Sequence, residues 1–396
     1  MRDRLFLQDC GVITPLGQGR TQVAERLFSA ERDAFVERDD LLPGRKVLVG
    51  AVTDELPRPP DSLAHLDCRN NRLMLAALRE IQPAVEAAAA HFGRHRIAVI
   101  LGTSTSGMAD GEAALQARRQ TGDWPASYDY RQQEIGSLAS FAANALDLSG
   151  PTYTIATACS SSAKVFASAR RLIRAGLADA AVIGGADTLC RMTLNGFGSL
   201  EALSRTRCNP FSRNRDGITI GEGACAFLLS PEPGPVELLG VGETSDAHHA
   251  TAPDPDGAGA LAAMAQALAD ARLTPVDIAY VNLHGTGTPL NDAMESRAVA
   301  ALLPPSTPCS STKGMTGHML GATGGVEAAF LWLALHPATS RGLLPPHLWD
   351  GQADPDLPSL SLVAPGTGMR QDGPTAMLSN SFGFGGNNVC LILGIA

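Results

Sequence analysis

The sequence predicts a layered α/β fold. Extended apolar segments alternate with helix-like segments through the first half of the chain, as they do in βαβ units. Two of the extended segments, 97–101 and 180–183, are apolar at every position, which is typical of strands buried on both faces. The 41 glycines and an aromatic content of only 5% suit helices and sheets that pack closely around tight turns.

The predicted elements fall into two halves. In the first half we expect strands at 96–102, 153–158, 180–185 and 224–229, with helices at 137–146 and 163–175. Three prolines between Ser230 and Pro235 then break all periodicity, so we divide the chain into an N-terminal half, residues 1–234, and a C-terminal half, residues 235–396. The second half again mixes strands and helices. We expect strands at 236–241, 278–283, 376–380 and 389–393 and helices at 259–271, 291–303 and 325–335. No internal sequence repeat is strong enough to prove a duplication.

Composition narrows the class of protein. A chain of 396 residues, 44% of them hydrophobic, can bury the core of one large domain or of two closely packed ones. Its net charge of -9 argues against nucleic acid as the main partner. With no apolar run of about 20 residues and no leader-like N-terminus, we expect a cytoplasmic protein without a membrane segment. Eight cysteines without a CxxC pair or zinc-ligand spacing indicate buried free thiols and no metal.

Cys159 lies at the junction between the predicted strand at 153–158 and the predicted helix at 163–175. The unpaired N–H groups and the positive end of the dipole at a helix start can lower the pKa of a thiol from about 8.5 towards 7 or below. We therefore expect a nucleophilic thiolate here. A lone cysteine is more often a small buried residue, but two histidine segments downstream favour the nucleophile.

The two histidines lie in glycine-rich loops. His284 ends the predicted strand at 278–283, where ligands gather in α/β sheets, although a loop histidine bonded to the backbone is an alternative. His318 follows Lys313 in the loop Ser311-Thr312-Lys313-Gly314-Met315-Thr316-Gly317-His318. Lys313 and Glu327 could form an ion pair that orients this loop, or they could be solvated surface charges.

A third glycine-rich segment, 379–388, joins two apolar strands. Its glycines could supply a backbone N–H to an oxyanion, with Phe384 as a movable gate. The alternative is a hairpin turn with a core phenylalanine. The chain contains neither GxGxxG before a helix nor GxxxxGK[ST], so we expect no nucleotide and no bound cofactor.

Together these motifs resemble the β-ketoacyl-acyl carrier protein synthases of the elongating (type I/II) branch. That family carries TAC, HGTxT, KxxxGH and GFGGTN, which read here as Thr157-Ala158-Cys159, His284-Gly285-Thr286-Gly287-Thr288, Lys313 to His318, and Gly383-Phe384-Gly385-Gly386-Asn387-Asn388. The stretches 209–217 and 221–223 also match. Asn387 stands where the family usually has threonine, so a hydrogen bond behind the gate is in doubt. The resemblance implies the thiolase fold, two similar halves in a five-layer αβαβα sandwich, usually as a homodimer.

The resemblance also implies a reaction and a role for each residue. An acyl chain would pass from acyl carrier protein to Cys159, and malonyl carrier protein would lose carbon dioxide and condense with it to a 3-oxoacyl thioester two carbons longer. His284 and His318 would stabilise the enolate. The backbone N–H groups of Cys159 and Phe384 would stabilise the tetrahedral oxyanion. The remaining roles are substrate binding by Thr286, Thr288 and Gly385, support of His318 by Lys313 and Glu327, and carrier contact by Arg69 and Arg72.

The pathway is left with two readings. Fatty acid biosynthesis is the first. However, Ser160-Ser161-Ser162 follows the cysteine, which is more similar to polyketide ketosynthases, whereas the enzymes of fatty acid synthesis more commonly have Ala-Thr there. The alternative is therefore a ketosynthase of a type II polyketide or aryl polyene pathway, as a homodimer or paired with a chain-length factor.

Other classes fit the motifs less well. A degradative thiolase would need a second cysteine near the C-terminus as its acid/base, but Cys390 lies inside an apolar strand after the gate loop, which is the wrong place. An initiating synthase would have asparagine at the position of His318. A chain-length factor would lack Cys159. A non-catalytic carrier-binding protein with a decayed site stays open and predicts that Cys159 is inert.

Overall fold

The computed structural model describes residues 4–370 and 375–395, and in these residues the strands form one twelve-stranded sheet and one separate hairpin. Five strands of the N-terminal half lie in the spatial order β6-β5-β7-β8-β1, where β5 is parallel to β6 and β7, and β8 is antiparallel to β7 and β1. Their bounds are β1 Phe6–Thr14, β5 Ile97–Gly102, β6 Thr152–Ile155, β7 Ala180–Asp187 and β8 Gly223–Ser230.

The C-terminal half repeats this topology. Its order is β11-β10-β13-β14-β9, where β10 is parallel to β11 and β13, and β14 is antiparallel to β13 and β9. The bounds are β9 Val236–Ser245, β10 Ile278–Asn282, β11 Pro308–Ser310, β13 Ala376–Gly383 and β14 Asn387–Ile395. The two halves meet where β1 pairs with the start of β9. The topology thus displays a duplication that the sequence alone did not establish.

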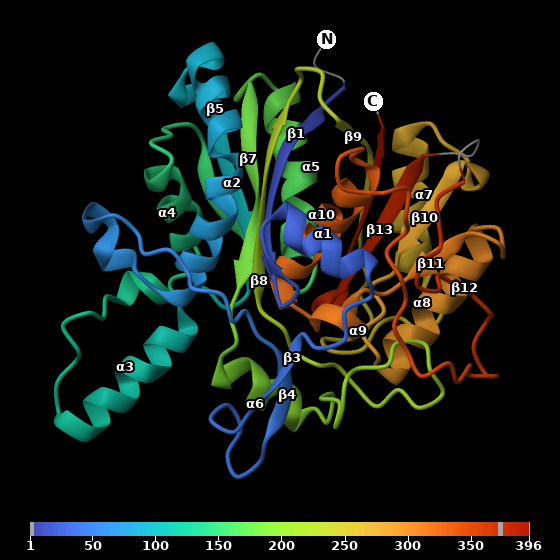
Figure 1. Cartoon of the computed structure of the whole chain (residues 1–396), viewed down its shortest axis with the longest axis horizontal. Coiled ribbons are helices and arrows are strands. Elements are labelled where there is room, and N and C mark those ends of the chain that lie inside the picture. The colour runs from blue at the N-terminus through green and yellow to red at the C-terminus, as the bar shows by residue number, and fades with distance from the viewer. Residues whose placement is uncertain (1–3, 371–374, 396) are drawn as a thin grey trace.

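The helices form three layers, and the strands of the two halves lie between them (Figure 1). Helices α5 (Ser161–Arg174) and α10 (Thr323–Leu335) pack against each other and against strands of both halves. Every residue of α10 is buried, as expected for an apolar helix inside a core. The outer faces are covered by α2 (Arg69–Phe92) and α4 (Ser137–Ala145) on one side and by α7 (Ala258–Ala271) and α8 (Pro289–Leu302) on the other. The predicted fold class is confirmed.

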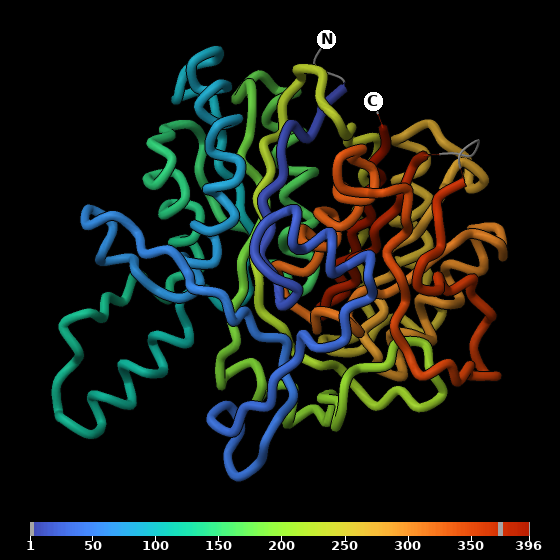
Figure 2. The backbone as a smooth tube through the Cα atoms, in the orientation of Figure 1, coloured from blue at the N-terminus to red at the C-terminus, as the bar shows by residue number. Residues whose placement is uncertain are grey.

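The helix α9 (Lys313–Thr316) is fully buried. The remaining elements flank the layers, and they are β2 Gly17–Gln18, α1 Arg20–Phe28, the hairpin β3 Phe35–Arg38 and β4 Val47–Gly50, α3 Met108–Thr121, α6 Arg191–Ser199 and β12 Ser361–Leu362. Figure 2 shows that α3 projects from the body and that the first and second halves of the trace occupy opposite sides of the molecule. Among the described residues, no helix combines the length and apolarity needed to cross a bilayer.

The loops that carry Cys159 and His284 follow strands of the two halves. The strand predicted at 153–158 ends earlier, at Ile155, because the chain turns sharply at Ala158, whose φ is +53°. The helix predicted from residue 163 begins two residues earlier, at Ser161. In the C-terminal half, β10 ends at Asn282, so His284 lies in the loop beyond the carboxyl end of its strand, as predicted.

Candidate active site

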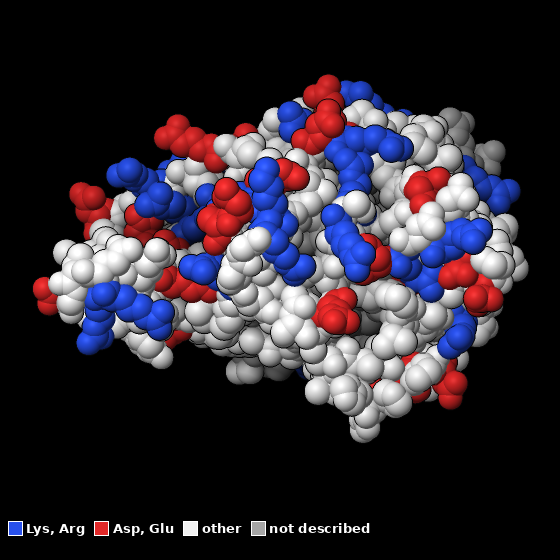
Figure 3. All heavy atoms as spheres, turned by 90° about the horizontal axis from the view of Figure 1, so that it is seen from below, with Lys and Arg blue, Asp and Glu red and all other residues white. Residues whose placement is uncertain are grey.

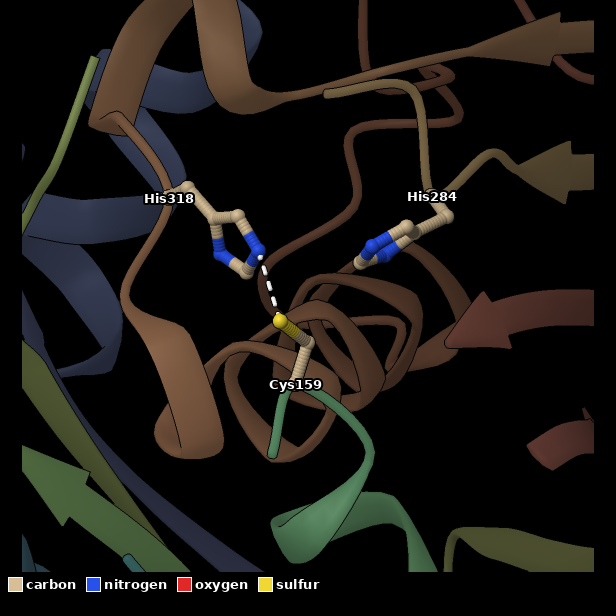
Figure 4. Close-up of side chains that lie close together, drawn as sticks. All are labelled: Cys159, His284 and His318. Carbon is tan, nitrogen blue, oxygen red and sulfur yellow. Dashed lines mark hydrogen bonds between the residues drawn. The ribbon is translucent and has the colours of Figure 1, made fainter. Parts of the chain in front are cut away.

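The thiol of Cys159 lies at the start of α5, in the bend that Ala158 creates. Few L-residues adopt a positive φ, so this bend is a strained position of the kind that concentrates at functional sites. The side chain is buried, with 6% of its surface exposed, and its Sγ lies 3.1 Å from Nε2 of His318 (Figure 4). The predicted nucleophile and one predicted histidine are therefore in direct contact.

The prediction of a lowered thiol pKa is wrong for the free site. Burial raises the pKa of Cys159 to about 11, and the opposing effects of the Lys313 ammonium and the Phe384 N–H are smaller. The helix terminus favours the thiolate, but the loss of water around the buried sulfur disfavours it more strongly. The thiol of the free site is accordingly neutral near pH 7.

His318 presents an N–H to the sulfur. Its Nδ1 accepts the backbone N–H of Leu320 at 3.2 Å and lies 2.9 Å from the Thr323 hydroxyl. Because Nδ1 is an acceptor, a neutral ring must carry its hydrogen on Nε2, the atom beside Cys159. Burial, helped by the Lys313 charge, lowers the pKa of His318 well below its usual value, so the ring is neutral.

His284 faces the same point from the other side of the site (Figure 4). The centroids of the His284 and His318 rings are 5.3 Å apart at 86°, and the reactive atoms of the two histidines and Cys159 all lie within 4.8 Å. Burial lowers the pKa of His284 well below its usual value too. Two neutral imidazoles that converge beside a thiol can donate hydrogen bonds to a negative oxygen formed there.

Lys313 and Glu327 form a buried ion pair. The alternative, that they are solvated surface charges, is therefore wrong. Lys313 Nζ lies 2.6 Å from Glu327 Oε1, and each side chain is only 1% exposed. Nζ also donates to the backbone carbonyl of His284. Burial raises the pKa of Glu327, and the ammonium opposes that rise. The pair thus supports the His284 loop by contact, while the lysine charge lowers the pKa of both histidines.

Phe384 lies beside the site, and its backbone N–H faces the Cys159 thiol. It lies in the turn η6 (Phe384–Gly386) between β13 and β14, and its ring is 5.6 Å from Phe197 of α6. Gly385 has φ +79° and Gly386 φ +80°, and a Cβ on Gly386 would collide with the Asp246 carbonyl, so this turn needs glycine. Asn388 bonds Asp246 across the turn at 2.9 Å.

A cavity of about 290 Å³ opens beside the thiol. Thr286 and Thr288 lie on its wall with their hydroxyl oxygens 2.9 Å apart, so both predicted substrate-binding threonines are placed together. The cavity is also lined by five other residues that were predicted to belong to the site, namely Cys159, His284, His318, Phe384 and Gly385.

Arg69 and Arg72 do not line this cavity. Arg69 binds the buried carboxylate of Glu222 through Nε at 2.9 Å and Nη2 at 2.5 Å. Arg72 binds Asp67 through two contacts of 2.6 Å. Both guanidinium groups are therefore engaged by carboxylates of this chain, and their contact with a carrier protein stays a prediction.

The sequence analysis missed Glu295, a buried residue of α8. Its carboxylate accepts the N–H groups of His284 and Gly285, each at 2.7 Å, and the side-chain amide of Asn380 at 3.0 Å. It thereby fixes the backbone that carries the second histidine. The available signal was its spacing: Glu295 lies four residues before Val299, so it shares the apolar stripe of the predicted helix.

Glu295 should make stability depend on pH. Burial raises its pKa to about 7, against an ordinary value of 4.5. Between these values the folded state holds a proton that the unfolded state has lost, so the free energy of unfolding should fall by about 3 kcal/mol as pH rises from 4.5 to 7. Urea unfolding of Glu295→Gln should show a flatter profile than the wild type over this range. The exposed Glu25→Gln is the control, and an equal slope in both variants would contradict the expectation.

The fold and the site define a condensing acyltransferase of the thiolase type. The family profile described as "Beta-ketoacyl synthase, N-terminal domain" matches residues 59–233, and "Beta-ketoacyl synthase, C-terminal domain" matches residues 236–348. The chain belongs to the β-ketoacyl synthase family. It is 34% identical to the 3-oxoacyl-[acyl-carrier-protein] synthase 2 of Staphylococcus aureus over 315 residues, 75% of this chain and 76% of that protein.

Solved structures are also similar to the chain. A chain of the ketosynthase (ApeO) in complex with its chain length factor (ApeC) from Xenorhabdus doucetiae matches with a TM-score of 0.94 and 46% identity, over 99% of this chain and 98% of that one. A chain of the ishigamide ketosynthase/chain length factor matches with a TM-score of 0.88 and 28% identity, over 99% of both chains.

Proposed function

We propose that the protein is a 3-oxoacyl-acyl carrier protein synthase that elongates acyl chains by two carbons. The observation that carries the proposal is the convergence of His284 and the His318 Nε2–H on the Cys159 thiol. In the first step the sulfur attacks the acyl thioester carbonyl, the C–S bond to the carrier breaks, and the carrier thiol leaves with a proton. The backbone N–H groups of Cys159 and Phe384 stabilise the tetrahedral oxyanion.

In the second step the malonyl thioester loses carbon dioxide. The electrons of the broken C–C bond pass to the thioester oxygen, where His284 and His318 donate hydrogen bonds to the enolate. The enolate carbon then attacks the acyl carbonyl on Cys159, and the C–S bond breaks to release the 3-oxoacyl thioester. The sulfur leaves as a thiolate beside the His318 N–H and takes up a proton from solvent, which restores the thiol.

The substrates travel on the phosphopantetheine arm of acyl carrier protein, and we assign Thr286, Thr288 and Gly385 to bind that arm. An acidic carrier needs local positive charge on a chain with a net charge of -9. The segment 191–216 forms part of the cavity wall through residues that include Glu201 and Asp216. It also carries five arginines, which lie outside the cavity lining. Figure 3 shows basic side chains spread among acidic ones across the lower face. These features support carrier binding near the mouth, with Arg69 and Arg72 as further candidates.

For the pathway, one observation favours the dedicated ketosynthase over general fatty acid synthesis. Similarity to a chain of the ketosynthase–chain length factor complex reaches 46% identity over nearly the whole chain, against 34% over 75% for the Staphylococcus synthase. We therefore propose a cytoplasmic aryl polyene or polyketide ketosynthase that pairs with a chain-length factor, with homodimeric fatty acid synthesis as the alternative. The halves 1–234 and 235–396 are proposed as its two structural units.

The test is to incubate the purified protein with a panel of acyl carrier thioesters and malonyl carrier protein, and to follow the masses of both proteins. Acylation at Cys159 followed by a two-carbon extension is the expected result. Extension only after a chain-length factor is added supports the paired enzyme, and extension without it supports the homodimer. No acylation under any condition would overturn the proposed activity.

Replacing His318 with alanine should separate the two chemical steps. Removing one preorganised donor to a developing oxyanion typically costs on the order of 10²–10³-fold in rate, so malonyl decarboxylation should fall by that amount while Cys159 is still acylated. Conversion of malonyl to acetyl carrier, followed by mass, gives the rate. The exposed His95→Ala is the matched control. Decarboxylation at the wild-type rate in His318→Ala would rule out this role.

A further inference from the structure

His347 is a buried histidine that the mechanism does not use. It follows Pro345 and Pro346 in the irregular segment between α10 and β12, and only 2% of its surface is exposed. Its backbone N–H bonds the Val363 carbonyl at 2.8 Å, which fixes the segment. Its ring lies beside two aromatic rings, with centroid distances of 6.1 Å to Phe211 and 5.7 Å to Trp349.

Both ring nitrogens of His347 join segments that lie far apart in the sequence. Nδ1 accepts the backbone N–H of Ser311 at 3.0 Å, and Nε2 lies 3.1 Å from the carbonyl oxygen of Pro210, which can only accept. One neutral tautomer, with its hydrogen on Nε2, satisfies both bonds. Burial lowers the pKa of His347 to about 4, which is consistent with a neutral ring.

The two joined segments enclose the residue after His284. A Cβ on Gly285 would lie 2.5 Å from Ser311 Cβ and 2.8 Å from Phe211 Cε2, so Gly285 fills a gap with no spare room. The Ser311 hydroxyl donates to the Gly285 carbonyl at 2.6 Å. His347 spans from Ser311 to the residue before Phe211, so its ring sets the width of that gap.

We propose that His347 is a positioning residue for the decarboxylation step, and that it acts through Gly285 on His284. The inference rests on the proposed function. His318 depends on different contacts, from Leu320 and Thr323, and Cys159 is held at the start of α5. Loss of the His347 bridge should therefore displace one enolate donor and leave the nucleophile in place. A displacement of about 1 Å at a reacting group can cost on the order of 10²-fold.

Three variants at one position test this role. His347→Phe keeps the bulk of the ring and removes both hydrogen bonds. His347→Gln can accept with its amide oxygen and donate with its amide nitrogen, whereas His347→Asn is too short to reach both partners. We expect kcat for malonyl decarboxylation to fall about 10²-fold in the Phe and Asn variants. Acylation of Cys159 and the KM for malonyl carrier should stay near wild type, and Gln should restore most of the rate.

The control is Trp349→Phe, which alters the ring packing but keeps both bonds and should decarboxylate normally. The proposal is overturned if folded Phe or Asn variants decarboxylate like the wild type, if acylation falls in parallel, or if Gln is no better than Asn. If the Phe variant does not fold, the Asn and Gln pair decides. If the wild type itself is inactive, the proposed function fails, and the imidazole ¹⁵N shifts of His284 still test the bridge: they must move in the Asn variant while those of His318 do not.

Discussion

Cys159→Ala should abolish chain elongation and leave malonyl decarboxylation measurable. Without the sulfur no acyl-enzyme can form, and removal of a nucleophile from such a catalytic unit costs on the order of 10⁴-fold or more. The donors for the enolate, His284 and His318, remain in place because their loops are held by Glu295, Leu320 and other partners away from the thiol. Intact-protein mass spectrometry should therefore show no acyl adduct, while acetyl carrier still accumulates from malonyl carrier.

The matched control for this experiment is Cys309→Ala. Cys309 is equally buried but lies in the short strand β11, where its thiol faces the Ser361 carbonyl. This variant should still form the acyl adduct. Elongation by Cys159→Ala at the wild-type rate would remove the covalent step from the mechanism. An adduct on another cysteine would place the nucleophile elsewhere.

Lys313→Met should destabilise the protein strongly. The change leaves the Glu327 carboxylate, 1% exposed, without the ammonium that lies 2.6 Å away. Breaking a buried ion pair by removing one partner typically costs about 3–5 kcal/mol, because a charge is left buried and uncompensated. The lost contact to the His284 carbonyl should also lower the decarboxylation rate of the protein that still folds. Urea unfolding and the decarboxylation assay measure the two effects.

The double variant Lys313→Met/Glu327→Leu tests the cause. If the cost of the single change comes from the orphaned carboxylate, removing it should recover most of the free energy of unfolding but not the decarboxylation rate. Lys46→Met provides the exposed control. Lys46 pairs with Glu37 at 3.2 Å in full solvent, and surface pairs contribute at most about 1 kcal/mol. Equal losses in Lys313→Met and Lys46→Met would contradict this account.

The fold and the clustering of the three main site residues could be predicted from local patterns. Cys159 and His284 each lie just beyond a strand, whereas His318 follows the short helix α9 in a glycine-rich loop. Loop positions of this kind are where α/β sheets place their ligands. The pairing of Lys313 with Glu327 stayed undecided, because the ion pair and the solvated alternative use the same residues at the same spacing.

The features that escaped prediction depend on tertiary packing. The pKa of Cys159 is raised because the folded protein excludes water from the sulfur. The position of the cysteine at a helix start does not show how deeply its side chain will be buried. His347 bonds partners 36 and 137 residues away, and no periodicity connects such positions. Burial of Glu295 could have been predicted more easily, because an acidic residue on the apolar stripe of a helix needs hydrogen-bond donors inside the protein.

The division of the site between the two halves of repeated topology matters during synthesis of the chain. The sulfur belongs to the first half to leave the ribosome, and both imidazoles belong to the second. A nascent chain that ends before His284 therefore contains the cysteine without either imidazole. Under the proposed mechanism, such a truncated chain cannot carry out the decarboxylation step.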